Sequence, residues 1–187
     1  MYKNRTKTIA VTAVLVALSF VMPYFMPTIT LPFTTFTLFS HVPVIIAMFI
    51  SPYTAIMSCI GTTMAFFLKA PTVVALRAAS HLIFAILGAF AIKRGLITKG
   101  ASIIVGGIST GLIHAVAEIV VVAIFMALNN QAITLYYIII EVGLITLMHH
   151  SIDYSFSLLV YKSGSKAKLL ENKFLFSQKK ASKDFNA

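Results

Sequence analysis

The chain has 187 residues and a formal net charge of +10, and 59% of its residues are hydrophobic whereas 11% are charged. Soluble domains carry about 25% charged residues, and a domain of this size could not bury so much apolar surface, so the composition excludes an ordinary water-soluble protein. The single cysteine, Cys59, also excludes an internal disulfide and a cysteine-based metal site.

Six hydrophobic segments, separated by proline, glycine, asparagine or basic residues, predict helices. In chain order, we expect them at about Thr8–Tyr24, Phe39–Ile50, Pro52–Leu68, Thr72–Ile92, Ala101–Leu128 and Leu135–Tyr161. With about 20 residues per span, this pattern predicts an all-α integral membrane bundle of six transmembrane helices over residues 1–162, followed by a polar basic tail at 163–187.

The segment Thr28–Leu38 differs from its neighbours because β-branched, aromatic and proline residues alternate in it. Such alternation is typical of extended chain and not of helix. We therefore expect an ordered outer loop between the first two helices.

Basic residues cluster at the ends of the hydrophobic segments. All of the Lys and Arg residues except Lys69 and Arg77 lie in the N-terminal segment, in the loop Lys93–Gly100, or from Lys162 onward. Cytoplasmic loops carry an excess of such residues, so we expect both termini in the cytoplasm and the protein in a bacterial plasma membrane. Because the clusters flank apolar spans, we expect them to contact lipid headgroups, and we expect no nucleic-acid partner.

Ionisable residues inside predicted spans are candidates for function, because a charge is costly in the bilayer. Arg77 lies about five residues into its helix, and His81 lies on the same face one turn deeper. A guanidinium binds a carboxylate through two hydrogen bonds and stacks on aromatic rings. The pair predicts a site for a small planar anion, and the alternatives are that Arg77 reaches out to headgroups or pairs structurally with Glu141.

A second pair at helical spacing, His114 and Glu118, lies on the fifth predicted helix. It predicts either a buried hydrogen bond that links helices or, together with His149 and His150, a metal-binding cluster. For His149, His150 and Asp153, on the inner half of the sixth predicted helix, we expect a structural or subunit-contact role.

Other polar residues mark the outer side of the predicted bundle. His41 follows the extended loop, and Asn130 and Tyr137 lie near the outer ends of the fifth and sixth predicted helices. Each of them either lines a pocket or serves as a helix cap or interfacial residue. We include them, with Glu141, among the candidate substrate-binding residues.

The sequence contains no phosphate-binding glycine-rich loop, no HExxH motif and no nucleophile elbow. We therefore expect no enzymatic activity, no cofactor and no resident metal. Any ATP-driven step would need a partner subunit.

Three runs carry a family resemblance, namely SHVPVIIAMFISP (Ser40–Pro52), GTTMAFFL (Gly61–Leu68) and LRAASHLIFAILGA (Leu76–Ala89). Together with the length, the basic start and the Ala-rich first helix, they resemble the substrate-binding S components of energy-coupling factor (ECF) vitamin transporters. The likeness covers about residues 5–160 and is strongest to the niacin-specific branch.

The resemblance implies uptake of a small vitamin, niacin (nicotinate), from an outward-facing pocket capped by the loop between the first two helices. It also implies two cytoplasmic ATPases and a transmembrane scaffold subunit that docks on the first helix at Ala13 and Ala17. Other vitamins stay open as ligands: pantothenate, pyridoxine, a pyrimidine or a queuosine precursor. A metal-dependent membrane protein that uses His114 and Glu118, and a structural membrane subunit without a ligand, also stay open.

Overall fold

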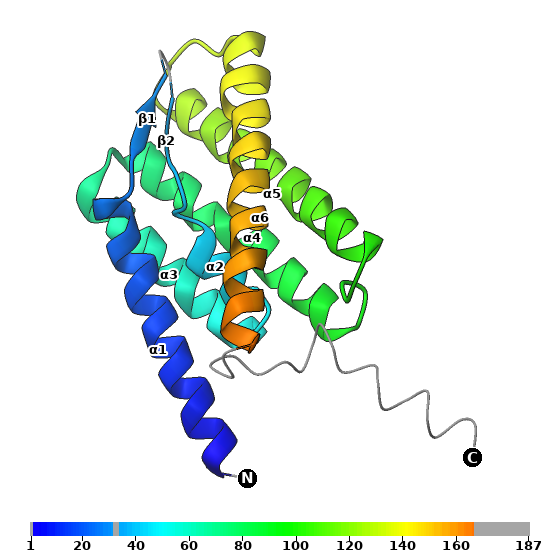
Figure 1. Cartoon of the computed structure of the whole chain (residues 1–187). Helices are drawn as coiled ribbons and strands as arrows, with labels where there is room; N and C mark the ends of the chain where they lie inside the picture. The colour runs from blue at the N-terminus through cyan, green and yellow to red at the C-terminus, as the bar shows by residue number, and fades with distance from the viewer. Residues whose placement is uncertain (1, 32–33, 167–187) are drawn as a thin grey trace.

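The computed structural model describes residues 2–31 and 34–166 as a helical bundle with one short hairpin (Figure 1). From residue 167 onward, the predicted basic tail lies outside the described residues. The elements are, in chain order, α1 (Tyr2–Phe25), β1 (Thr28–Thr30), β2 (Thr35–Thr37), α2 (Val42–Met48), α3 (Pro52–Lys69), α4 (Thr72–Lys93), α5 (Ala101–Leu128), η1 (Tyr137–Leu144) and α6 (Ile145–Lys166). All six predicted helices are present, which confirms the all-α fold class.

The helices run back and forth between two ends of the bundle. α1 starts at one end, the β1–β2 hairpin lies at the other, and α6 returns to the end that holds the N-terminus (Figure 1). Within the described residues, the helical segments Thr6–Phe25, Thr72–Lys93 and Ala101–Leu128 are long and apolar enough to cross a membrane. The chain is a multi-pass membrane protein.

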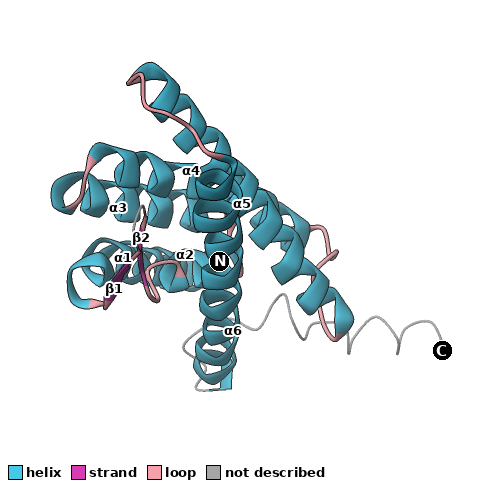
Figure 2. Cartoon of the chain, turned by 90° about the horizontal axis from the view of Figure 1, so that it is seen from above, coloured by secondary structure: helices cyan, strands magenta, loops and turns pink. Residues whose placement is uncertain are grey.

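The predicted extended loop is an antiparallel hairpin. Ile29 of β1 lies opposite Phe36 of β2, and the hydroxyls of Thr28 and Thr37 are hydrogen-bonded at 3.0 Å. Seen from above, the hairpin lies over α1 and α2, whereas α5 lies on the other side of α6 (Figure 2). It therefore covers one end of the bundle.

The second helix is shorter than predicted. It begins at Val42 and not at Phe39, because Phe39 has a φ of 61°, which an α-helix does not accommodate. The backbone N–H groups of Phe39 and His41 instead donate to the two carboxylate oxygens of Asp153, at 3.0 and 3.1 Å. All seven residues of α2 are buried, and because they rise only about 10 Å, the hairpin and α2 together make the second passage through the bundle.

The first helix is longer than predicted at both ends, since it begins at Tyr2 and continues through Pro23 to Phe25. Proline removes its own N–H donor but does not prevent the last turn from forming. The carbonyl of Pro23 accepts a hydrogen bond from Lys69 Nζ at the end of α3. This contact satisfies an acceptor at the end of α1 and ties α1 to α3.

The last predicted helix is present, but its first turns have π-helical geometry. The π-helix η1 covers Tyr137–Leu144 and is followed by α6, which ends at Lys166. π-Helical turns are rare and occur frequently at functional sites. Glu141, in the middle of η1, is buried.

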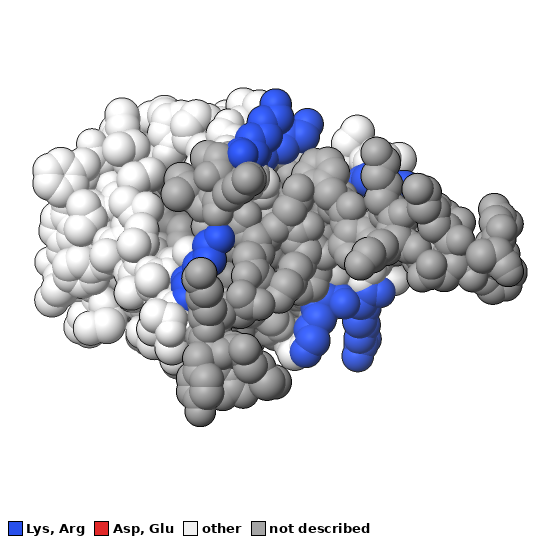
Figure 3. All heavy atoms as spheres, turned by 60° about the horizontal axis from the view of Figure 1, so that its bottom comes forward, with Lys and Arg blue, Asp and Glu red and all other residues white. Residues whose placement is uncertain are grey.

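Basic side chains gather at the end of the bundle that holds the N-terminus (Figure 3). Lys93, Arg94 and Lys99, around the α4–α5 loop, are exposed, as are Lys162 and Lys166 near the end of α6. Among the described residues, no Asp or Glu is visible on this face. These basic side chains therefore lie away from the hairpin.

Candidate functional site

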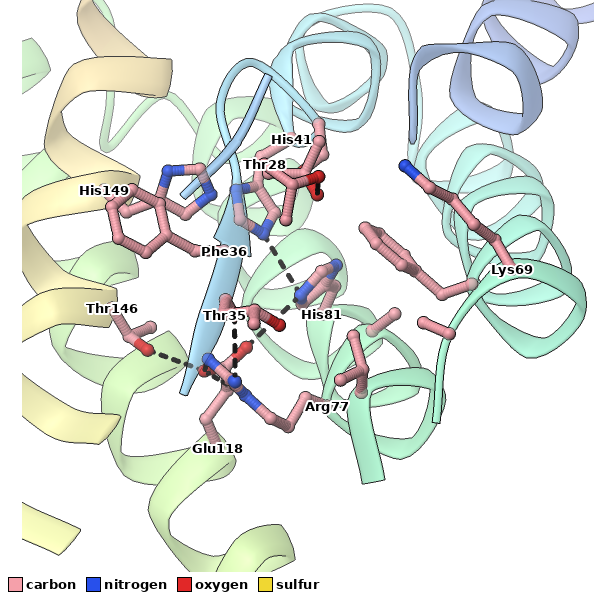
Figure 4. Close-up of a pocket in the computed structure, with 16 residues that line it drawn as sticks. Thr28, Thr35, Phe36, His41, Lys69, Arg77, His81, Glu118, Thr146 and His149 are labelled. Atoms are coloured by element: carbon pink, nitrogen blue, oxygen red, sulfur yellow. Dashed lines mark hydrogen bonds and ion pairs between the residues drawn. The ribbon is translucent and has the colours of Figure 1, made fainter. Parts of the chain in front are cut away.

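A cavity of about 80 Å³ lies beneath the hairpin, between it and helices α3 to α6 (Figure 4). Its lining residues come from every element that meets there: Thr28, Thr35, Phe36, Thr37, Ser40, His41, Phe66, Lys69, Ala70, Val74, Arg77, Ala78, His81, Glu118, Thr146 and His149. Pockets for drug-sized ligands measure about 300–1,000 Å³. This cavity suits a small ligand.

Arg77 is the central cation of the cavity. Its Nε and Nη2 donate to Glu118 Oε2 of α5 at 3.0 and 2.8 Å, and its Nη1 donates to Thr34 Oγ1 at 2.8 Å and to the carbonyl of Thr35 at 3.2 Å. Glu118 Oε2 also accepts from the hydroxyl of Thr146 in α6 at 2.6 Å. One ion pair thus connects the hairpin with α4, α5 and α6. The structural partner of Arg77 is Glu118, where the sequence had suggested Glu141.

Histidine rings form a second wall of the cavity. His41 precedes α2, and its Nδ1 lies 3.0 Å from Asp153 Oδ2, while its Nε2 lies 3.1 Å from Nε2 of His81 in α4. His149 of α6 lies 4.5 Å from His41 between ring centroids. All three rings are buried. Asp153 holds His41 both through the backbone and through the ring, which fixes the direction in which the ring faces.

Of the six candidate substrate-binding residues predicted from the sequence, the structure brings Arg77, His81 and His41 to this cavity. The other candidates lie elsewhere. Asn130 is exposed in the turn after α5, with a φ of 52°, and Tyr137 lines a separate groove beside Val73. Glu141 is buried in η1 but does not line the cavity.

Several lining residues were not predicted as substrate contacts. Thr35 and Phe36 of β2 face the cavity, and only the alternating pattern of the loop could have indicated them. Lys69, an exposed residue at the end of α3, adds a second cation to the lining. Thr146 carries no signal in the sequence, because its role depends on contact with Glu118 across two helices.

The remaining predicted pairs are also visible. His114 Nε2 lies 3.2 Å from Glu118 Oε1, as expected for a buried hydrogen bond at helical spacing. Ala13 and Ala17 are exposed on α1. On the opposite face of this helix, the hydroxyl of Thr12 is hydrogen-bonded at 2.9 Å to that of Thr54 in α3.

Comparison with known proteins identifies a relative over most of the chain. The sequence is 31% identical, over 172 residues, to a protein of Lactococcus lactis subsp. cremoris (strain MG1363) described as the niacin transporter NiaX. The match covers 88% of this chain and 78% of that relative. No family model matches the chain, and no solved structure matches it.

Proposed function

The chain belongs to the family of the niacin transporter NiaX, and on that premise we propose that it binds nicotinate in the cavity beneath the hairpin, as the substrate-binding S component of an ECF importer. The similarity over most of both chains is the observation that carries the proposal. The size and the chemistry of the cavity support it independently. Nicotinate is a small, flat ring with one carboxylate.

The carboxylate of nicotinate is matched by the cations of the cavity. Arg77 shares its guanidinium with Glu118, and Lys69 stands at the exposed side of the lining. Because the interior has a low dielectric constant, a guanidinium there attracts an anion more strongly than in water. Lys69 draws the anion toward the cavity, and Arg77 binds it within.

The ring of nicotinate is matched by flat side chains. Phe36 of the hairpin and His149 of α6 line the cavity with their ring centroids 5.2 Å apart. His81 has a buried Nδ1 without a hydrogen-bond partner in the described structure. A pyridine ring packs against such faces by offset or edge-to-face contact.

Transport requires partners, because the sequence has no nucleotide-binding motif. We propose that a transmembrane scaffold subunit contacts α1 at the exposed Ala13 and Ala17, and that two cytoplasmic ATPases supply the energy. The basic face formed by the α4–α5 loop and the end of α6 faces the cytoplasm in this proposal. The cavity then opens toward the outside.

A ligand panel tests the proposed function. The purified protein is heated with nicotinate, pantothenate, pyridoxine, a pyrimidine precursor or a queuosine precursor, and its unfolding temperature is measured. A ligand at 100 times its Kd stabilises the folded state by about 2.7 kcal/mol, so nicotinate should raise the unfolding temperature and the others should not. Stabilisation by another vitamin but not by nicotinate would contradict the proposal.

A further inference from the structure

All five histidines of the chain lie together in the interior of the bundle: His41, His81, His114, His149 and His150. They come from the turn before α2, from α4, from α5 and from α6, and each is buried. Capture of one small anion does not require so many imidazoles. The hydrogen bonds of these histidines indicate which other ligand the cluster can bind.

The first line of hydrogen bonds starts at Thr110 of α5. Its hydroxyl lies 2.8 Å from the carbonyl of Gly106 and 3.2 Å from His150 Nε2, and when it donates to Gly106 it accepts from His150 Nε2. A neutral His150 then has a lone pair on Nδ1 and accepts from His114 Nδ1 at 3.2 Å. His114 is left with a lone pair on Nε2, and this atom faces Glu118 Oε1 at 3.2 Å. In this set of tautomers two acceptors face each other and a metal ion fits between them, whereas in the opposite set His114 Nε2 donates a hydrogen bond to Glu118.

The second line starts at Asp153 of α6. A carboxylate only accepts hydrogen bonds, so His41 donates from Nδ1 to Asp153 Oδ2 and keeps a lone pair on Nε2. This lone pair is directed at His81 Nε2, 3.1 Å away. The two lines therefore point ring nitrogens of His41 and His114 into one region, and the ring of His81 lies 4.3 Å from that of His41 and 4.7 Å from that of His114 between centroids.

Distances in this region match those of a metal coordination shell. One ligand atom from each of His41, His81 and His114 lies within 4.8 Å of the others. Around tetrahedral Zn²⁺, with bonds of about 2.0–2.1 Å, neighbouring ligand atoms are about 3.3 Å apart. The corresponding separations are 3.1 Å between the Nε2 atoms of His41 and His81, 3.2 Å from His114 Nε2 to Glu118 Oε1, and 3.6 Å from His81 Nε2 to Glu118 Oε1.

We propose that His41, His81 and His114, together with Glu118, bind a divalent transition metal ion of the Zn²⁺ type at the wall of the cavity. Imidazole and carboxylate are suitable ligands for such an ion. Metal-bound histidines usually donate their other N–H to a carboxylate or another acceptor, and here Asp153 and His150 fill that role for His41 and His114. The sequence predicted no resident metal, and the proposed site departs from that prediction.

A second grouping, His41, His149 and Asp153, also brings ligand atoms within 4.8 Å of one another. It is the weaker candidate because both oxygens of Asp153 already accept backbone N–H groups, from Phe39 and His41. His149 therefore provides a matched control: it is a buried histidine of the same cluster that is not among the proposed ligands.

Metal titration of the full chain tests the site. The protein is purified with a histidine-free affinity tag, stripped with a chelator and titrated with Zn²⁺ and with Co²⁺, followed by elemental analysis and by the visible spectrum of Co²⁺. We expect one ion per chain and the intense visible bands of tetrahedral Co²⁺. His81→Asn and His114→Asn should lose stoichiometric binding, whereas His149→Asn should keep it.

Two results would overturn the inference. One is wild-type protein that takes up no stoichiometric metal and gives only an octahedral Co²⁺ spectrum, in which case His114 Nε2 donates a hydrogen bond to Glu118. The other is loss of binding in His149→Asn with retention in His81→Asn. If the ligand variants fail to fold, as judged by size-exclusion chromatography, the wild-type spectrum alone decides. The measurement contains no nicotinate, so its outcome is separate from that of the vitamin panel.

Discussion

Arg77 is held in place by the hairpin and by Glu118 of α5, and this arrangement gives it two roles. Its pair with Glu118 is structural, because a buried guanidinium persists only with a partner. Its position in the lining of the cavity makes it the proposed anchor for the ligand carboxylate. A single substitution would remove both roles at once, so a pair of variants is needed to separate them.

Arg77→Met should lower stability by about 3–5 kcal/mol, because it leaves Glu118 buried without its cation. The double variant Arg77→Met/Glu118→Gln removes both charges and should recover most of the unfolding temperature. Nicotinate binding should be lost in both. If the folded double variant binds nicotinate as tightly as the wild type, Arg77 is not part of the binding site.

At the scale of elements, α1 has two different faces. One face packs closely on α3: a Cβ atom added at Gly61 would lie 2.9 Å from the carbonyl oxygen of Val16, so the two backbones approach too closely for a larger residue. The other face exposes Ala13 and Ala17. Small residues of this kind permit close approach of a second helix within the membrane.

Ala13→Trp and Ala17→Trp should leave nicotinate binding unchanged and abolish co-purification with the scaffold subunit, because the indole blocks close helix contact. Val116→Trp, at an exposed position of α5, is the matched control. It adds the same ring to a lipid-accessible face and should retain the complex. Equal co-purification of all three variants would show that the scaffold docks elsewhere.

The elements were predictable to different degrees. Hydrophobic runs with proline and glycine boundaries predicted all six helices, and the spacing of Arg77 and His81 predicted correctly that they share a face. The positive φ of Phe39 and the π-helical turns of η1 were not predictable, because they depend on contacts with distant elements. For the same reason, the sequence alone did not reveal Glu118 as the partner of Arg77.

Asn130 and Glu141 show why some of the predicted site residues lie outside the cavity. Both were selected from their estimated depth along a helix, but depth does not define the direction around the helix axis. Asn130 is exposed in a turn, and Glu141 is buried outside the lining of the cavity. Residues of the hairpin line the cavity because the chain folds back over it, which no helical pattern could indicate.

At the scale of the whole molecule, the two regions for which we propose a function lie at opposite ends. The hairpin and the cavity beneath it occupy one end, and the basic face occupies the other (Figures 1 and 3). This separation agrees with a protein that receives its ligand outside and meets cytoplasmic partners inside. The assignment of the basic face to the cytoplasm stays a prediction.

We propose that the cavity binds nicotinate through the negative charge of the nicotinate carboxylate. A calorimetric titration of the purified wild-type protein tests this most directly. Nicotinate and its neutral amide, nicotinamide, have nearly the same shape, and a hydrogen bond to a charged group contributes about 1.5–3 kcal/mol. Nicotinate should therefore bind at one site per chain, and nicotinamide about 10- to 100-fold more weakly. Equal affinity for the two compounds, or no binding of nicotinate, would contradict the account.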